Sequence, residues 1–210
     1  MNPNVLEFVS FRLKQEVTDE SFLEAARRSQ LTLQRYEGFV GRDMFYHQES
    51  GLRFDLVEWR DKHAAKRASE SFLRDSAAAA FLDVLDASSV DLQLYSRLPE
   101  LDIASANGSE YAGNCVELIC FQLKSEKECP YYLRYAEEMG RQMQAAPGFI
   151  RRSVFRSENT GEWLEVIRYS SRAEADALFA KLQDEACMQK ALQLVDEQTL
   201  QLYFVTPEKL

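Results

Sequence analysis

The feature that most constrains this chain of 210 residues is a repeat with a period of 110 residues. The segment VLEFVSFRLK at 5–14 aligns with CVELICFQLK at 115–124. Between residues 5–96 and 115–206, 17 of the 92 aligned pairs are identical, where unrelated chains of ordinary composition would match at roughly 6. Each half is long enough to bury a core of its own. The sequence therefore predicts one repeat at 1–96, a linker at 97–114 and a second repeat at 115–210.

The same order of secondary structure can be read in both halves. β-branched and aromatic residues predict strands at 5–13, 39–46, 53–59 and 90–95, and again 110 residues further on. A helix is predicted to begin near Ser21, and a second over 61–85 with a break near Asp75. Because βαβ crossovers are right-handed, the order βαββαβ predicts a four-stranded antiparallel sheet with both helices on one face, the ferredoxin-like plait.

The first strand indicates how the other face of each sheet is covered. Val5 and Val9 fall on one face of it, and Leu6 and Phe8 fall on the opposite face, so neither face suits water. Two such sheets in one chain can cover each other. The predicted fold class is therefore α+β, with two fused ferredoxin-like βαββαβ repeats forming an intramolecular dimeric α+β barrel. Unpaired sheet edges would also allow a further homodimer.

Charge and composition narrow the classes of partner and cofactor. The net charge of −9 and the isoelectric point near 4.9 disfavour nucleic-acid binding, because the field of the whole molecule repels phosphate. No basic leader and no long apolar run is present, so a cytoplasmic protein without a membrane segment is expected. Four cysteines without a C-x-x-C pair, and only two histidines, do not make a metal set.

One stretch of the first half resembles a known family. The residues Leu56-Val-Glu-Trp-Arg-Asp-Lys-His-Ala-Ala65, followed by a long amphipathic helix, resemble the strand-to-helix signature of the antibiotic-biosynthesis monooxygenase family within the dimeric α+β barrel superfamily. The resemblance covers both halves in element order and about thirty residues of the first half in detail. Superfamily members include cofactor-free oxygenases of aromatic polyketides, haem-degrading enzymes, isomerases and decarboxylases, so the fold alone does not select an activity.

The resemblance implies a pocket between sheet and helices, lined by Trp59. The haem-degrading branch ligates iron through a histidine about ten residues after that tryptophan, where this chain has Ser69 and, in the second half, Phe179. Haem, other cofactors and metals are therefore not expected. His63 stands at the start of the second helix, which is not the matching position.

The expected ligand is a small hydrophobic or aromatic molecule with a few polar anchors. Trp59 and His63 are the candidate catalytic residues, since a histidine could act as the base that a cofactor-free oxygenation needs. Side chains expected to bind the substrate are Trp59, Tyr46, His47, Phe22 and Phe72. His63 corresponds to an alanine in the second half, so the two halves cannot offer the same site. If the protein has one active pocket, that pocket is expected in the first half.

Polar pairs also recur in the repeat. Glu7 and Arg42 have identical counterparts at Glu117 and Arg152. Opposed charges on neighbouring strands, or across the interface between the halves, could fix the docking of the two sheets, and this role is favoured over substrate binding.

Two function classes remain open from the sequence. The first is a cofactor-independent monooxygenase-like protein. The alternative is a non-catalytic module that binds small molecules or other proteins and has a degenerate pocket.

Overall fold

The computed structural model of the chain describes residues 5–106 and 115–210. These residues form two compact units. Unit 1 extends to Ser96 and includes the last four residues, Pro207–Leu210, and unit 2 is Arg97–Thr206. Residues 107–114 of the predicted linker lie outside the described residues.

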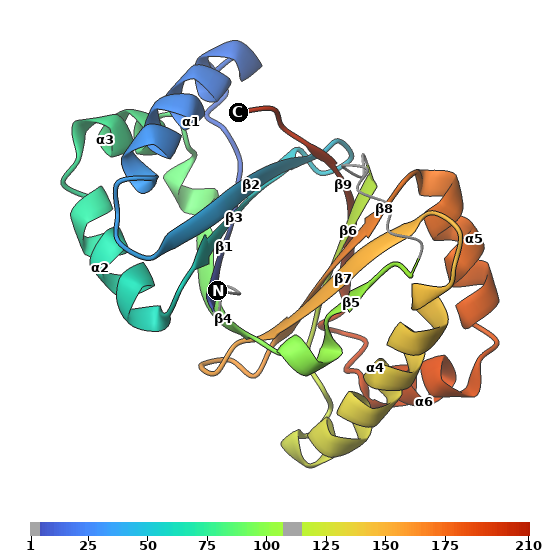
Figure 1. Cartoon of the computed structure of the whole chain (residues 1–210). Coiled ribbons are helices and arrows are strands. Elements are labelled where there is room, and N and C mark those ends of the chain that lie inside the picture. The colour runs from blue at the N-terminus through green and yellow to red at the C-terminus, as the bar shows by residue number, and fades with distance from the viewer. Residues whose placement is uncertain (1–4, 107–114) are drawn as a thin grey trace. The chain divides into compact units, whose positions relative to one another are not determined.

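Unit 1 contains one antiparallel sheet, in the order β4-β1-β3-β2, with its helices on one face (Figure 1). Its elements are β1 (Val5–Phe11), α1 (Asp19–Leu33), β2 (Phe39–His47), β3 (Leu52–Trp59), α2 (Lys62–Phe72), α3 (Ser76–Asp83), the 3-10 turn η1 (Ala87–Ser89) and β4 (Asp91–Arg97). The element order and strand pairing expected from the sequence are both present, and the predicted α+β class is confirmed.

Local chemistry accounts for the ends of these helices. Thr18, rather than Ser21, caps α1, because its hydroxyl accepts the backbone N–H of Ser21. Asp75 separates α2 from α3 by accepting the first free N–H groups of α3, at the predicted break. Gly38 has φ +89°, and a Cβ there would meet the Cβ of Ala64 at 2.5 Å, so glycine lets the loop before β2 approach α2 closely.

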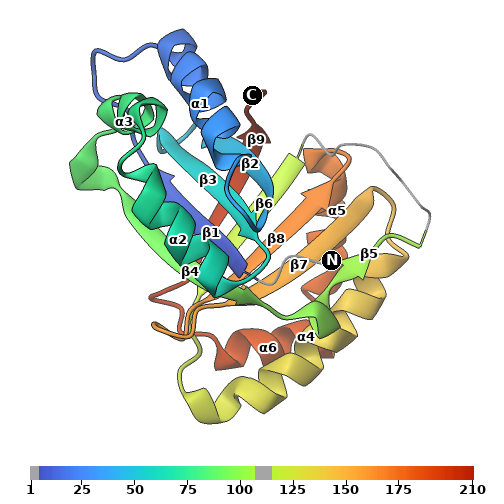
Figure 2. The same ribbon diagram turned by 60° about the vertical axis from the view of Figure 1, so that its left-hand side comes forward.

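Unit 2 repeats this order, and its helices likewise lie on one face of its sheet (Figure 2). Strand β6 lies between β8 and β9, and β7 pairs with the other edge of β8. Its elements are η2 (Pro99–Leu101), β5 (Ile103–Ala104), β6 (Cys115–Phe121), η3 (Glu126–Glu128), α4 (Cys129–Gln144), β7 (Phe149–Arg156), β8 (Trp163–Tyr169), α5 (Arg172–Leu182), α6 (Ala186–Leu194) and β9 (Gln201–Pro207).

The first part of the predicted linker is structured. Strand β5 pairs with β7, and Leu101 is buried in the core beneath α4. Ile103 packs against a second apolar cluster of the same unit. These apolar side chains gain free energy by leaving water, which explains why the segment joins unit 2 instead of remaining an open connection.

The sheet of unit 1 has two different faces. Glu7, Asp55 and Trp59 alternate onto the face that the helices cover, in the register that pairs β1 with β3. Leu6 and Phe8 on the opposite face are also buried, with 1% and 7% of their surface exposed. None of the helices in residues 5–106 and 115–210 is long and apolar enough to cross a bilayer.

Candidate functional site

A cavity of about 120 Å³ lies between the sheet and the helices of unit 1. Three charged side chains of the sheet, Glu7, Arg42 and Asp55, form part of its wall, and the rest is mainly apolar. The remaining lining residues are Val9, Phe11, Leu33, Val57, Trp59, Ala68, Ser69, Phe72, Leu73, Phe81, Leu82, Leu85, Val90 and Leu92.

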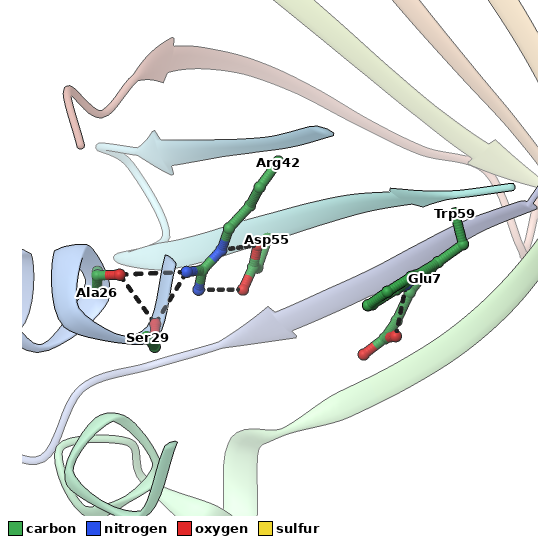
Figure 3. Close-up of polar contacts among 6 residues, drawn as sticks. All are labelled: Glu7, Ala26, Ser29, Arg42, Asp55 and Trp59. Carbon is green, nitrogen blue, oxygen red and sulfur yellow. Dashed lines mark hydrogen bonds and ion pairs between the residues drawn. The ribbon is translucent and has the colours of Figure 1, made fainter. Parts of the chain in front are cut away.

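Glu7 is the titratable group of this cavity that is not tied into an ion pair. Its Oε2 accepts the indole N–H of Trp59 at 3.1 Å, and Figure 3 shows its other oxygen directed away from that ring. Within the described part of the chain, the hydrogen bond found for the Glu7 carboxyl is the one from Trp59 to Oε2, and none is found to Oε1. Burial, and next the negative charge of Asp55, raise the pKa of Glu7 to about 7. Glu7 can therefore exchange a proton near neutral pH.

Arg42 and Asp55 form a two-bond ion pair beside Glu7. The Arg42 Nε and Nη2 atoms donate to the two Asp55 oxygens at 2.8 and 2.6 Å (Figure 3). Arg42 Nη1 donates to the backbone oxygen of Ala26 at 3.2 Å and to the hydroxyl of Ser29 at 2.9 Å, both on α1. Because these partners occupy most of its N–H groups, Arg42 joins helix to sheet and has little capacity left to bind an anionic ligand.

Unit 2 contains the same network at positions 110 residues further on. Arg152 forms a two-bond ion pair with Glu165 and donates to the backbone oxygen of Ala136. Tyr169, at the position of Trp59, donates its hydroxyl to Glu117 at 2.9 Å. Burial also raises the pKa of Glu117 to about 7. These ion pairs join neighbouring strands of the same sheet, which is one of the two arrangements expected from the sequence, so the recurrence reflects a buried tie inside each unit.

The two units differ in how much side-chain volume fills this region. Ala68, on the cavity wall of unit 1, corresponds to Leu178 in unit 2, which is 4% exposed. Asp55 corresponds to the longer Glu165, which also accepts the hydroxyl of Tyr132. Unit 1 thus has the shorter side chains at positions 55 and 68, whereas Phe72 and Phe81 are larger than their counterparts Leu182 and Ala191.

The structure brings two of the six predicted site residues to the cavity. Trp59, with 1% of its surface exposed, and Phe72 both line it. The other four are not among its lining side chains.

Those four lie elsewhere in unit 1. Phe22 is buried in the core between α1 and α3, and the guanidinium of Arg53 stacks on the rings of Phe22 and Tyr46. His47 contacts Ser50 in the turn after β2, and His63 is exposed in the first turn of α2.

Glu7, Arg42 and Asp55 are the site residues that sequence reasoning did not assign to the pocket. The recurrence of Glu7 and Arg42 at 117 and 152 is a usable signal, although on sequence alone it favours a structural contact, between neighbouring strands or between the halves, over substrate binding. Asp55 gives a weaker signal, since its counterpart is a glutamate. A charged residue that alternates onto the covered face of a strand is the feature that could have identified all three.

The cavity does not fit a haem group. Neither histidine of the chain lines it, and its volume is close to that of a cavity of roughly 150 Å³ that holds one benzene ring, far smaller than a tetrapyrrole. In residues 5–106 and 115–210, no group of three or more histidine, cysteine or acidic side chains is arranged to hold a metal ion.

No protein-family model and no curated protein sequence matches this chain. Solved structures do. One is a protein of Fusobacterium nucleatum described as an inferred monooxygenase, which is 10% identical in sequence and superimposes with a TM-score of 0.72. The alignment covers 99% of this chain and 93% of the Fusobacterium chain. A mutant chlorite dismutase of Candidatus Nitrospira defluvii is 10% identical with a TM-score of 0.69, covering 100% and 93%.

A third structure, from Listeria monocytogenes, is a ferredoxin-fold protein related to antibiotic biosynthesis monooxygenases. It is 11% identical with a TM-score of 0.56, covering 100% and 97%. At these identities the likeness concerns the fold alone. The chain thus has an α+β, monooxygenase-like fold with ferredoxin-fold neighbours.

Proposed function

We propose that unit 1 binds a small apolar compound of about one ring and oxidises it as a cofactor-independent monooxygenase-like protein. The observation that carries the proposal is the carboxyl group of Glu7. It stands in the wall of a mainly apolar cavity, with one oxygen held by Trp59 and no hydrogen bond found to the other among the described residues. A ligand with an acidic hydrogen would supply one. Glu7 takes the role of base that the sequence assigned to His63, which is exposed away from the cavity.

The chemistry requires a base, a dry cavity and an electron-rich substrate. With a pKa of about 7, Glu7 is partly ionised at neutral pH and can accept a proton from a phenolic hydroxyl. A monocyclic quinol and one molecule of dioxygen give a hydroxyquinone and one molecule of water. One oxygen atom forms a new bond to a ring carbon, and the other leaves as water with two hydrogens from the quinol. The quinol supplies all four electrons, so no further reductant is needed.

Oxygen consumption with methylhydroquinone, corrected for autoxidation, tests this proposal. We expect uptake that increases with pH through about 7, because only ionised Glu7 can accept a proton. Glu7→Gln, which keeps the acceptor for Trp59 but cannot take a proton, should lower the rate at least 100-fold. The isosteric control in unit 2 is Glu117→Gln, which should leave the rate unchanged.

Two more variants test the identity of the base and the place of the site. His63→Ala should leave uptake unchanged, and a loss comparable to that of Glu7→Gln would return the role of base to His63. Ala68→Leu places the side chain of unit 2 in the cavity and should abolish both binding and turnover in a folded protein. Turnover that survives Ala68→Leu would contradict the cavity as the site.

Trp59→Phe tests whether the indole positions Glu7. The Trp59 hydrogen bond lowers the pKa of Glu7, so its removal should move the pH midpoint of oxygen uptake upward. Trp59→Tyr, which introduces the donor that Tyr169 provides in unit 2, should restore the midpoint at least in part. A merely structural role of Trp59 would leave the midpoint in place.

The second candidate function is binding without chemistry, in a module with a degenerate pocket. It is favoured by the volume of about 120 Å³, below the range of roughly 300–1,000 Å³ common for ligand sites. Calorimetric binding of methylhydroquinone without oxygen uptake above autoxidation would select this function. The same Glu7→Gln and Ala68→Leu variants would then report on affinity instead of rate.

We also propose that the two units descend from a duplicated ferredoxin-like βαββαβ element, divided as 1–96, 97–114 and 115–210, and pair as an intramolecular α+β barrel. The shared element order and the 110-residue register of the Arg42–Asp55 and Arg152–Glu165 pairs support the duplication.

A further inference from the structure

Four large apolar side chains border the cavity and remain exposed to solvent. They are Leu73 after α2, Leu82 on α3, Val90 before β4 and Leu92 on β4, and they are 69%, 37%, 40% and 47% exposed. We refer to these four residues as the rim. Contiguous exposed apolar surface beside a cavity is characteristic of a binding surface. The rim is therefore a candidate extension of the site.

The volume of the cavity determines what can reach the rim. About 120 Å³ accommodates one aromatic ring, by comparison with a cavity of roughly 150 Å³ that binds benzene. Any carbon atoms beyond that ring must leave the cavity, and their path lies over the rim. The charged lining residues, Glu7, Arg42 and Asp55, all lie on the sheet and not at the rim. An alkyl chain thus suits the path better than a charged tail.

The counterparts of the rim residues in unit 2 show which features of the rim both units share and which belong to unit 1. Three of its members have exposed leucines as counterparts: Leu192, Leu200 and Leu202. Two of the positions that differ bear on the path from the rim to the cavity. Leu73 corresponds to Gln183, and Ala68, between rim and sheet, corresponds to the buried Leu178. In unit 1 the four rim residues line the cavity, and Leu202 provides a matched control for Leu92.

We propose that the ligand of unit 1 is amphipathic: a single hydroxylated ring presents its acidic hydrogen to Glu7 inside the cavity, and an unbranched alkyl chain lies along the rim. The inference rests on the binding part of the proposed function and adds the substrate class.

Calorimetric titration of the full chain with phenol and with 4-n-alkylphenols from methyl to heptyl tests the proposal. Full burial of one methylene group corresponds to about a four-fold gain in affinity, and the rim covers one side of the chain, so we expect Kd to fall about two-fold per methylene. Leu92→Glu and, separately, Leu73→Glu should remove this dependence on chain length. Leu202→Glu should retain it.

Each contrary outcome overturns the inference in a distinguishable way. If phenol binds, and chain length has no effect on Kd, the rim is not part of the site although the proposed function stands. If Leu202→Glu weakens the chain-length dependence as much as Leu92→Glu does, the alkyl chain does not bind at the rim of unit 1. If neither phenol nor any alkylphenol binds, the proposed function fails and the inference fails with it.

Discussion

The raised pKa of Glu7 suits it to act as a base, and it also makes the folded protein less stable as the pH rises. Its carboxyl is buried in the wall of a mainly apolar cavity, where burial favours the neutral form and raises its pKa. In the unfolded chain the same group ionises near its ordinary pKa of 4.5. Between these two pKa values the folded protein binds a proton that the unfolded chain has lost, so stability falls as pH rises. The pKa of Glu117 is shifted in the same direction by the same first cause.

The pH dependence of unfolding checks this account. Glu7→Gln should leave the free energy of unfolding nearly unchanged at a pH of about 4.5 and raise it at a pH of about 8, by on the order of 3 kcal/mol, because the buried group can no longer ionise. Glu117→Gln should give a gain of the same sign. Urea denaturation at both pH values measures the effect. A Glu7→Gln variant less stable than the wild type at the higher pH would show that burial does not disfavour the ionised carboxylate.

At the scale of elements, Arg42 and Asp55 determine how α1 is seated on the sheet. The Arg42 side chain is fully buried, and one guanidinium joins β2, β3 and two groups of α1. Unit 2 reproduces the arrangement with Arg152 and Glu165. A paired buried charge adds little net stability compared with apolar packing, but it fixes one arrangement of helix and sheet.

Single and double substitutions separate the effect of pairing the buried charges from the effect of side-chain packing. Arg42→Met should lower the free energy of unfolding by about 3–5 kcal/mol, because it leaves the Asp55 carboxylate buried without its partner. Arg42→Met combined with Asp55→Leu should recover most of that loss, since no unpaired charge remains. Denaturant titrations of the single variants, the double variant and the wild type form the required cycle. Equal losses in Arg42→Met and the double variant would mean that packing, and not charge, is what the arginine supplies.

At the scale of the whole molecule, unit 1 is built from both ends of the chain. The backbone N–H of Glu208 donates to the carbonyl oxygen of Met44 at 2.8 Å, and its Oε1 accepts from Arg53 at 3.1 Å. Arg53 is 5% exposed and also pairs with Asp19. The last residues therefore complete the charge balance of a buried arginine on β3.

Removal of residues 207–210 should lower the free energy of unfolding by about 1–3 kcal/mol, because Arg53 loses a partner and Met44 loses a backbone hydrogen bond. Glu208→Gln, which keeps the backbone bond and removes the charge, should cost less than the deletion. Chemical denaturation at neutral pH compares the two variants. An unchanged midpoint in the truncated chain would show that the tail makes no net contribution.

The sequence by itself determined the order of elements and the α+β class. Strand alternation, the apolar helix stripe and the break at Asp75 are local signals, written within about twenty residues. The 110-residue register also pointed to Glu7 and Arg42, although not to their role. The sequence predicted a linker at 97–114 but not that its first part is structured. That structure depends on the packing of Leu101 and Ile103 against α4 and the adjoining core, which are distant in sequence.

Only the tertiary structure decided which residues share a site. The cavity is formed jointly by four strands and three helices, and no local pattern in the sequence marks which of their side chains will meet there. The pKa of Glu7 likewise depends on distant residues that exclude water from it. His63 has the chemistry of a base but lies on an exposed turn, whereas Glu7 gains that chemistry from its surroundings, because desolvation is a property of the packed molecule and not of the residue.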